Sequence, residues 1–130
     1  MERQTRLSPF LLSMGHYSCF MLEETISKIE AKLQTTGAIK EENRSELLEL
    51  VSTLKKEVAA LSKTHDEQAE SIAGFANVSA HEATRQEKNP ELLKVSLQGL
   101  SSSVEGFEKS HPELVAIVNR ICTTLSNMGV

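Results

Sequence analysis

The sequence of 130 residues has no tryptophan and one tyrosine, and aromatic residues make up only 4 % of it. Compact β-sheet domains depend on aromatic and β-branched residues, so this composition disfavours a β-rich fold. Three prolines leave long stretches without a helix breaker. Glu, Leu, Ala, Ser and Lys dominate instead, and most of these favour helices. The composition therefore predicts an all-α protein.

The sequence also lacks a basic cluster and a cysteine framework. Its net charge is −4, and the one adjacent pair of bases, Lys55 and Lys56, is followed by Glu57. Nucleic-acid binding usually needs a basic face, so we expect no nucleic-acid partner. The two cysteines, Cys19 and Cys122, do not resemble a secreted disulfide scaffold. Cys122 follows Ile121 in an apolar stretch and is predicted to be a small buried residue.

Sequence motifs for catalysis are missing too. The segments after Gly37 and Gly74 lack the Gly-Lys-Ser/Thr ending of a phosphate-binding loop, and the motif at His81 is HExxR instead of the zinc-protease HExxH. One Glu-x-x-His motif occurs, at Glu108 and His111, whereas di-iron bundles need two. We therefore expect no enzyme activity, no catalytic residue and no cofactor.

The first twenty residues differ from the rest of the chain. They contain Pro9, Gly15 and Tyr17 and break the helical pattern. The stretch is too short and polar to span a bilayer, and no clear signal-peptide cleavage site follows it. An amphipathic pattern starts directly after Met21, so residues 1–20 are predicted to be a disordered tail or an extension upstream of a true start at Met21. A peripheral membrane contact through residues 7–20 is an alternative.

The remaining residues, 21–130, are predicted to form a single helical domain. Apolar residues spaced three and four apart indicate four helices, at about residues 22–36, 41–86, 90–109 and 112–128. Gly37 is suited to end the first helix. Asn89 and Pro90 are suited to begin the third.

The helices can be paired from the sequence. A short turn around Lys88 makes the third helix run back along the second, so that residue numbers of facing positions sum to about 175. This register pairs Phe75 with Leu100 and Leu54 with Ile121 along one apolar seam. It also pairs Ala76 with Gly99 along a second seam of small residues, which lets the two helices approach closely. A kink at Pro112 would keep the third and fourth helices in one line. We therefore predict a long, coiled-coil-like antiparallel hairpin. The first helix is expected to thicken it to a three-helix bundle at one end, by packing against the start of the second helix and against the fourth helix.

Two sets of residues are candidate sites. The same register places His65 opposite His111, with Glu108 nearby, as a candidate for a metal site or for a polar, pH-sensitive break that sets the register. Partial exposure of both histidines is the simplest alternative. The two-helix arm presents the predicted packing and interaction residues: Ile72, Phe75, Ala76, Ala80, Leu97, Gly99, Leu100 and Val104.

Several strings of the sequence are distinctive, above all SIAGFANVSAHEATRQEKNPEL and NRICTTLSNMGV. Over about residues 21–130 the chain resembles the domain-of-unknown-function 4404 family, small helical proteins mostly from Gram-negative bacteria. The resemblance implies a bacterial, cytosolic helical protein and transfers no catalytic residue.

These observations predict a non-enzymatic helical scaffold or protein-interaction module in the cytoplasm. It is expected to bind a protein partner or to self-associate as a homodimer, without an integral membrane segment. The alternative is a metal- or pH-responsive binding protein that uses the histidine pair.

Overall fold

The computed structural model describes residues 14–37 and 39–128, with side chains from Met21 onward. In this part the chain forms five α-helices and no strand, so the predicted all-α class is confirmed. The helices are α2 (Met14–Thr35), α3 (Glu41–Leu61), α4 (Asp66–Thr84), α5 (Pro90–Ser103) and α6 (Pro112–Met128). The helix α2 includes residues 14–20, which were expected to belong to a disordered tail or to an extension upstream of Met21. Residues 1–13 lie outside the described part, and the start at Met21 stays a prediction.

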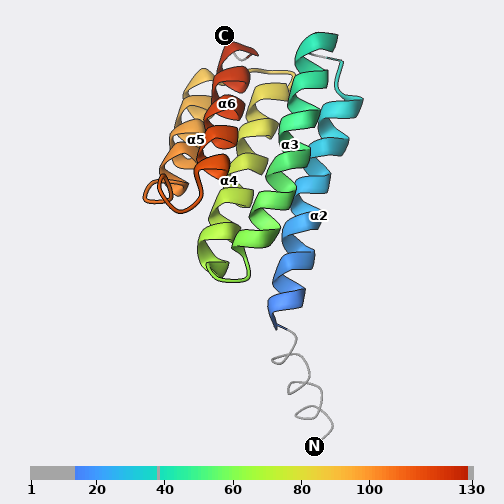
Figure 1. Cartoon of the computed structure of the whole chain (residues 1–130). Helices are drawn as coiled ribbons and strands as arrows, with labels where there is room; N and C mark the ends of the chain where they lie inside the picture. Colours follow the sequence, from blue (N-terminus) through green and yellow to red (C-terminus); the bar gives the residue numbers. More distant parts are fainter. Residues whose placement is uncertain (1–13, 38, 129–130) are drawn as a thin grey trace, which may run out of the picture.

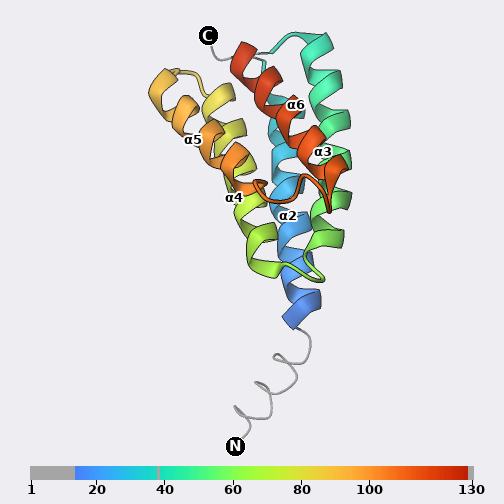
Figure 2. The same cartoon turned by 60° about the vertical axis from the view of Figure 1, so that its left-hand side comes forward.

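Consecutive helices run in opposite directions and form a bundle (Figures 1 and 2). The N-terminal helix α2 packs against α3 and α4, α4 packs against α5, and α6 packs against α3 and α5. The core lies between the helices, with Ile26, Leu54, Ile72 and Leu114 all fully covered.

The predicted continuous helix over residues 41–86 is wrong, because the chain reverses between α3 and α4. After Leu61 the backbone N–H of Thr64 donates to the Leu61 carbonyl at 3.1 Å, a tighter turn than the α-helix. The Ser62 hydroxyl also donates to the Ala59 carbonyl at 2.7 Å. Hydroxyl groups that satisfy the last carbonyls of a helix stabilise its end, so the reversal needs neither glycine nor proline.

The predicted helix over residues 90–109 is also shorter than expected, and α6 does not continue it across a kink. The helix α5 ends at Ser103, and Gly106 in the following loop has a φ of 95°. This left-handed conformation suits glycine because it has no Cβ. The loop therefore turns the chain back, and α6 runs antiparallel to α5 (Figure 2).

Together the two reversals fold the predicted long hairpin in half. The expected pairings of α4 with α5 and of α3 with α6 survive, because both arms turn back at the same level. For example, Val51 and Leu54 of α3 and Ile121 and Leu125 of α6 line one small interior space.

The folding in half changes the role of the N-terminal helix. The helix α2 was expected to cover α3 and α6, whereas it lies against α3 and α4. Its buried stripe of Leu22, Ile26, Ile29 and Leu33 meets a face of α4 that is rich in buried alanine. These alanines, whose small size allows neighbouring helices to approach closely, are Ala69, Ala73, Ala76, Ala80 and Ala83.

Side chains also secure the helix ends. The guanidinium of Arg44 donates to the carbonyls of Leu33 and Gln34, and to that of Thr36 at 2.9 Å. A cation at these free carbonyls stabilises the end of α2 and fixes α3 beside it. The side chain of Asn89 accepts a hydrogen bond from the Leu92 N–H at 3.1 Å, the predicted cap of α5.

Candidate functional site

A groove of about 610 Å³ lies between α5 and α6. Leu93 is buried at its floor, and Leu97 and Cys122 are half-buried beside it. The groove is lined by Pro90, Leu93, Lys94, Leu97, Gln98, Ser101, Cys122, Thr123, Ser126 and Asn127. An apolar floor with a polar rim is the arrangement found where proteins bind other molecules.

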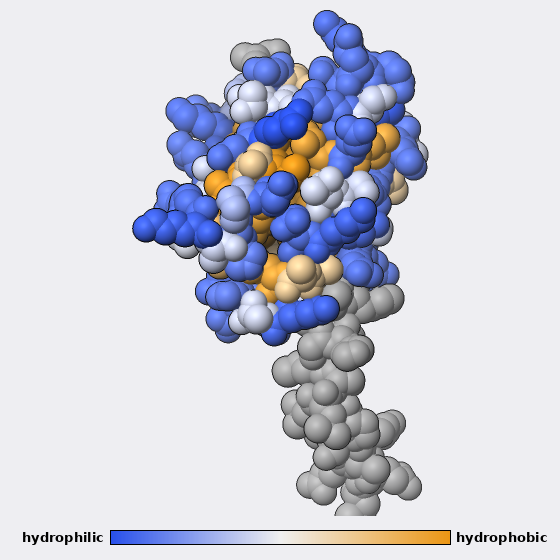
Figure 3. Space-filling view, in the orientation of Figure 1, coloured by the Kyte–Doolittle hydropathy of each residue, from blue (hydrophilic) through white to orange (hydrophobic). Residues whose placement is uncertain are grey.

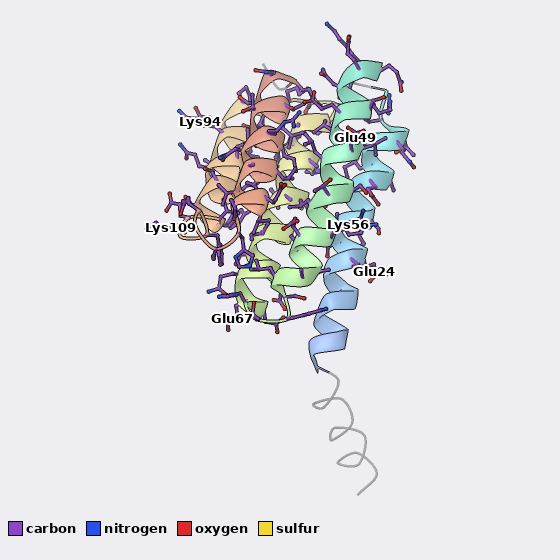
Figure 4. All side chains as sticks on the ribbon, in the orientation of Figure 1. Glu24, Glu49, Lys56, Glu67, Lys94 and Lys109 are labelled. Carbon is purple, nitrogen blue, oxygen red and sulfur yellow. The ribbon has the colours of Figure 1, made fainter. Side chains whose placement is uncertain are left out.

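The charge of the groove comes from one side chain. Lys94 stands on the α5 side of the rim and projects away from the bundle in Figure 4. None of the ten lining residues is Asp, Glu or His, the usual groups for proton transfer. The groove therefore has the character of a binding surface with one positive charge.

The thiol of Cys122 in this groove is kept in its neutral form. Burial raises the pKa of Cys122 from 9.0 to about 11, because a thiolate is poorly solvated among apolar groups. Its Sγ lies 3.9 Å from the Leu97 carbonyl, a weak contact across the groove. Since the thiolate is the nucleophilic form, Cys122 acts here as an apolar lining residue.

The surface around α6 is more hydrophobic than its surroundings. On the face shown in Figure 3, hydrophobic atoms gather near α6 and hydrophilic side chains cover most of the remainder. Val115 and Ile117 of α6 and Leu48 of α3 are partly buried and pack at the edge of the core. The hydrophobic surface of α6 thus extends beyond the groove.

The predicted histidine pair does come together, beside Phe107. The ring centroids of His65 and His111 are 6.1 Å apart, and each ring meets the Phe107 ring edge-on, at 5.3 and 5.4 Å. The Nδ1 atoms lie 2.8 Å from the Thr64 hydroxyl and 2.9 Å from the Ser110 hydroxyl. The cluster joins the α3–α4 turn to the α5–α6 loop.

The third predicted member of the metal candidate is engaged elsewhere. The carboxylate of Glu108 is exposed and accepts a hydrogen bond from the Gly106 N–H at 3.0 Å. Within the described residues, no three side chains among His, Cys, Asp and Glu are grouped so as to hold a metal ion. The two histidines therefore lack the further ligands that a protein metal site usually has.

Most of the predicted interaction residues lie in the core. Leu97 lines the groove, and the ring of Phe75, which is 40 % exposed, lies over Gly99. Sequence reasoning had paired Gly99 with Ala76, one position away. The residues that are buried in the core are Ile72, Ala76, Ala80, Leu100 and Val104.

Sequence reasoning missed the exposed apolar residues Val78, Leu92 and Val95. They lie on α4 and α5, off the heptad stripe that was used to pair these helices. A search for apolar residues outside the stripe would have found them. The groove had no such signal, because it depends on the antiparallel placement of α5 and α6.

Among the helices that the structure describes, none has both the length and the apolar character needed to cross a bilayer.

Comparison with known proteins identifies the family of the chain. No curated protein and no solved structure shows significant similarity to the chain. A family model matches residues 22–130, which are all but the N-terminal segment. The chain therefore belongs to the family described as "Domain of unknown function (DUF4404)".

Proposed function

We propose that the protein is a non-enzymatic interaction module that binds an apolar helical segment of a partner protein in the α5–α6 groove. The observation that carries this proposal is the groove itself, with Leu93, Leu97 and Cys122 along its length. Grooves between two helices are common receptors for amphipathic helices, which place apolar side chains into them at helical spacing. The neutral Cys122 thiol and the lack of acidic or histidine side chains in the lining support a binding role over catalysis.

The groove also suggests the chemistry of the partner. The helix α5 has 14 residues and is about 21 Å long at 1.5 Å per residue, which matches about four turns of a partner helix. Lys94 at the rim favours an acidic residue at the edge of the apolar face of that helix. The expected partner segment is therefore an amphipathic helix with one or more carboxylates beside its apolar stripe.

Site-specific photo-crosslinking in cells tests this proposal. A photoreactive amino acid at Gln98, on the groove rim, should yield a crosslinked product that the same probe at exposed Lys56 on α3 does not. The purified partner should then protect Cys122 from alkylation. Equal products at both positions, or no protection of Cys122, would refute binding in the groove.

The proposal includes a scaffold role, self-association and a cytoplasmic location. The thiol of Cys122 is free, which fits a reducing compartment. A two-sided helical bundle that binds a second copy and a partner can hold both in one assembly.

A second candidate function is a pH-responsive switch at the histidine cluster, with metal binding as its weaker form. His65, Phe107 and His111 join both chain reversals, so two imidazolium charges there would repel each other. At about 6 Å the repulsion is about 0.7 kcal/mol in water and rises as solvent is excluded. Zinc or nickel titration tests metal binding, and urea unfolding at pH 5 and pH 8 tests the pH response. His111→Ala is the control in both experiments. This alternative is refuted if the wild type and His111→Ala show the same difference in stability between pH 5 and pH 8 and if no metal binds.

A further inference from the structure

The helices α3 and α4 share one stripe of positions, although the chain reverses between them. The positions recur at alternating intervals of four and three residues, which is the spacing of a coiled coil. Two separate helices joined by a turn need no common phase, because the turn resets it. The continuous stripe is therefore typical of a single helix over both segments. Its positions are Leu47, Val51, Leu54, Val58, Leu61, His65, Gln68, Ile72 and Phe75.

The reversal between α3 and α4 depends on few residues. The backbone N–H of His65 donates to the Leu61 carbonyl at 2.7 Å, and that of Ala69 donates to the His65 carbonyl at 3.0 Å. Both bonds have the four-residue spacing of an α-helix. Ser62 is helical, with a φ of −63° and a ψ of −19°, whereas His65 has a φ of −133° and a ψ of 70°. A change of dihedral angles at and near His65 therefore joins α3 and α4 into one helix.

The second reversal has enough chain to open as well. Eight residues lie between Ser103 and Pro112, and they reach up to about 26 Å when extended. In an open hairpin with the same helix pairs, Ser103 and Pro112 are nine positions apart along the joined helix, or about 14 Å. The rings of His65, Phe107 and His111 hold this loop against the first turn. The two reversals thus lie side by side and act as one double hinge.

We infer that two copies of the chain exchange their α4–α5 hairpins across this double hinge. The helices α4 and α5 are consecutive and pack on each other, so they move as one unit. In the exchanged dimer α3 continues into α4, and the hairpin of each copy packs against α2, α3 and α6 of the other copy. Every contact between helices is then formed again with the second copy, which is why domain swapping is a low-cost route to a dimer.

The balance between monomer and dimer depends on the hinge and on concentration. The same helix faces meet in both states, so their burial is equal. The joined helix adds hydrogen bonds, because the first N–H groups of α4 and the last carbonyls of α3 gain helical partners. The closed monomer has the advantage that its hairpin is tethered, with an effective concentration on the order of millimolar for a short linker. We therefore expect dimers as the concentration of the chain approaches this value.

The exchange changes the origin of the groove walls. The helix α6 stays with α3, so each groove of the dimer lies between α5 of one copy and α6 of the other. The groove is present in both states, with Leu97 and Cys122 among its lining residues. The exchange rests on the proposed function only in naming how the interaction module self-associates. Whether the groove binds a partner helix does not depend on it.

Light scattering after size-exclusion chromatography, with the full chain folded at micromolar to millimolar concentrations, measures the dimer. Asp66→Pro should abolish it. Asp66 is the first residue of α4, where proline fits, whereas proline inside the joined helix removes a hydrogen bond and clashes with the preceding turn. Glu41→Pro, at the first residue of α3, is the matched control and should leave the dimer fraction unchanged. Circular dichroism checks that both variants are folded.

The double variant Ser62→Ala/Thr64→Ala should have the opposite effect. The two hydroxyls donate to the carbonyls of Ala59 and Leu61 at the end of α3, and alanine has the higher helix propensity. Both changes favour a joined helix over a turn. Since the dimer contains two such hinges, we expect its dissociation constant to fall at least about tenfold.

Spin labels on different chains identify the exchange directly. One chain carries a label at Glu42 and another at Glu87, both through an unnatural amino acid, and the two chains are refolded together at millimolar concentration. In the exchanged dimer the two labels lie at one end of the same bundle, so a distance of about 20 Å between chains is expected. In a dimer formed by surface contact, each chain keeps its own hairpin and this distance between chains is absent.

Three results would overturn the exchange. They are a dimer without the short distance between labels, a dimer that persists in a folded Asp66→Pro variant, and a monomer at all concentrations in both the wild type and the double alanine variant. If Asp66→Pro does not fold, the distance between labels in the wild type decides alone. None of these results affects crosslinking from Gln98, so failure of the exchange and failure of the groove proposal remain distinguishable.

Discussion

The contact between Gly99 and Phe75 permits a quantitative test of how α4 and α5 pack. A Cβ at position 99 would approach three carbons of the Phe75 ring, with Cζ at 2.9 Å and the others closer. Gly99→Ala therefore displaces the ring. The same substitution also raises helix propensity, which stabilises α5 by about 1 kcal/mol. The two effects have opposite signs and can be separated.

The structure gives the size of each effect. Phe75 is 40 % exposed, so its covered part contributes about 1.5 kcal/mol, somewhat over half of the value for a fully buried Phe. Losing this contact while gaining propensity makes Gly99→Ala destabilising by about 0.5 kcal/mol. In a Phe75→Ala background the ring is absent, so Gly99→Ala should stabilise by about 1 kcal/mol. The predicted coupling is about 1.5 kcal/mol.

Urea unfolding followed by circular dichroism measures this coupling. The four proteins of the double-mutant cycle should be compared at the same low protein concentration, because the ring of Phe75 is 40 % exposed. If Gly99→Ala changes the free energy of unfolding equally in the wild-type and Phe75→Ala backgrounds, the coupling is zero. That result would refute the packing of this ring on the glycine.

Three further predictions address the fold and its buried polar groups. Spin labels at Glu42 and Glu87 should be about 20 Å apart, because both residues lie at one end of the bundle. A continuous helix would separate them by about 67 Å. Pulsed electron resonance measures the distance, and a value near the longer one contradicts the reversal between α3 and α4. Ser79 is fully buried and its hydroxyl has no partner among the described residues, so Ser79→Ala should raise the free energy of unfolding by about 1–2 kcal/mol. Ser96→Ala, which removes a hydroxyl bonded to a carbonyl at 2.9 Å, is the control and should not stabilise. Because the pKa of Cys122 is raised, the unfolded chain loses the thiol proton near pH 9 and the folded chain near pH 11. The contribution of this group to the free energy of unfolding is therefore fully present below pH 9 and is lost as the pH rises to about 11. Cys122→Ala should lack this loss in a pH series of urea unfolding.

The histidine cluster shows how far sequence reasoning reached at a site. The register brought His65 and His111 together, and their rings are in contact through Phe107. The same reasoning added Glu108 because it is close in the sequence, yet its carboxylate bonds to its own loop. Proximity in the sequence does not give the direction of a side chain in an irregular loop, and this is where the prediction ended.

The reversal between α3 and α4 was hidden for a related reason. Ser62 and Thr64 are tolerated inside helices, and their hydroxyls end a helix only when tertiary packing favours the end. The polar positions His65 and Gln68 do interrupt the apolar stripe. Such a pattern also fits a weak point within a straight helix, whereas in the structure it marks the limit of one helix and the start of the next.

The sequence by itself determined that the chain is helical, that α5 begins at its Asn89 cap, and that α4 pairs with α5 and α3 with α6. Apolar periodicity indicates which residues are buried between helices. The same helix pairs form in a straight hairpin and in a hairpin that is folded in half. Only the tertiary structure decided between them. Folding the hairpin in half lets α2 cover α3 and α4 together, which buries the alanine face of α4 and brings α5 and α6 side by side to form the groove. The free energy of that burial comes from contacts between helices distant in the sequence, and no local pattern contains it.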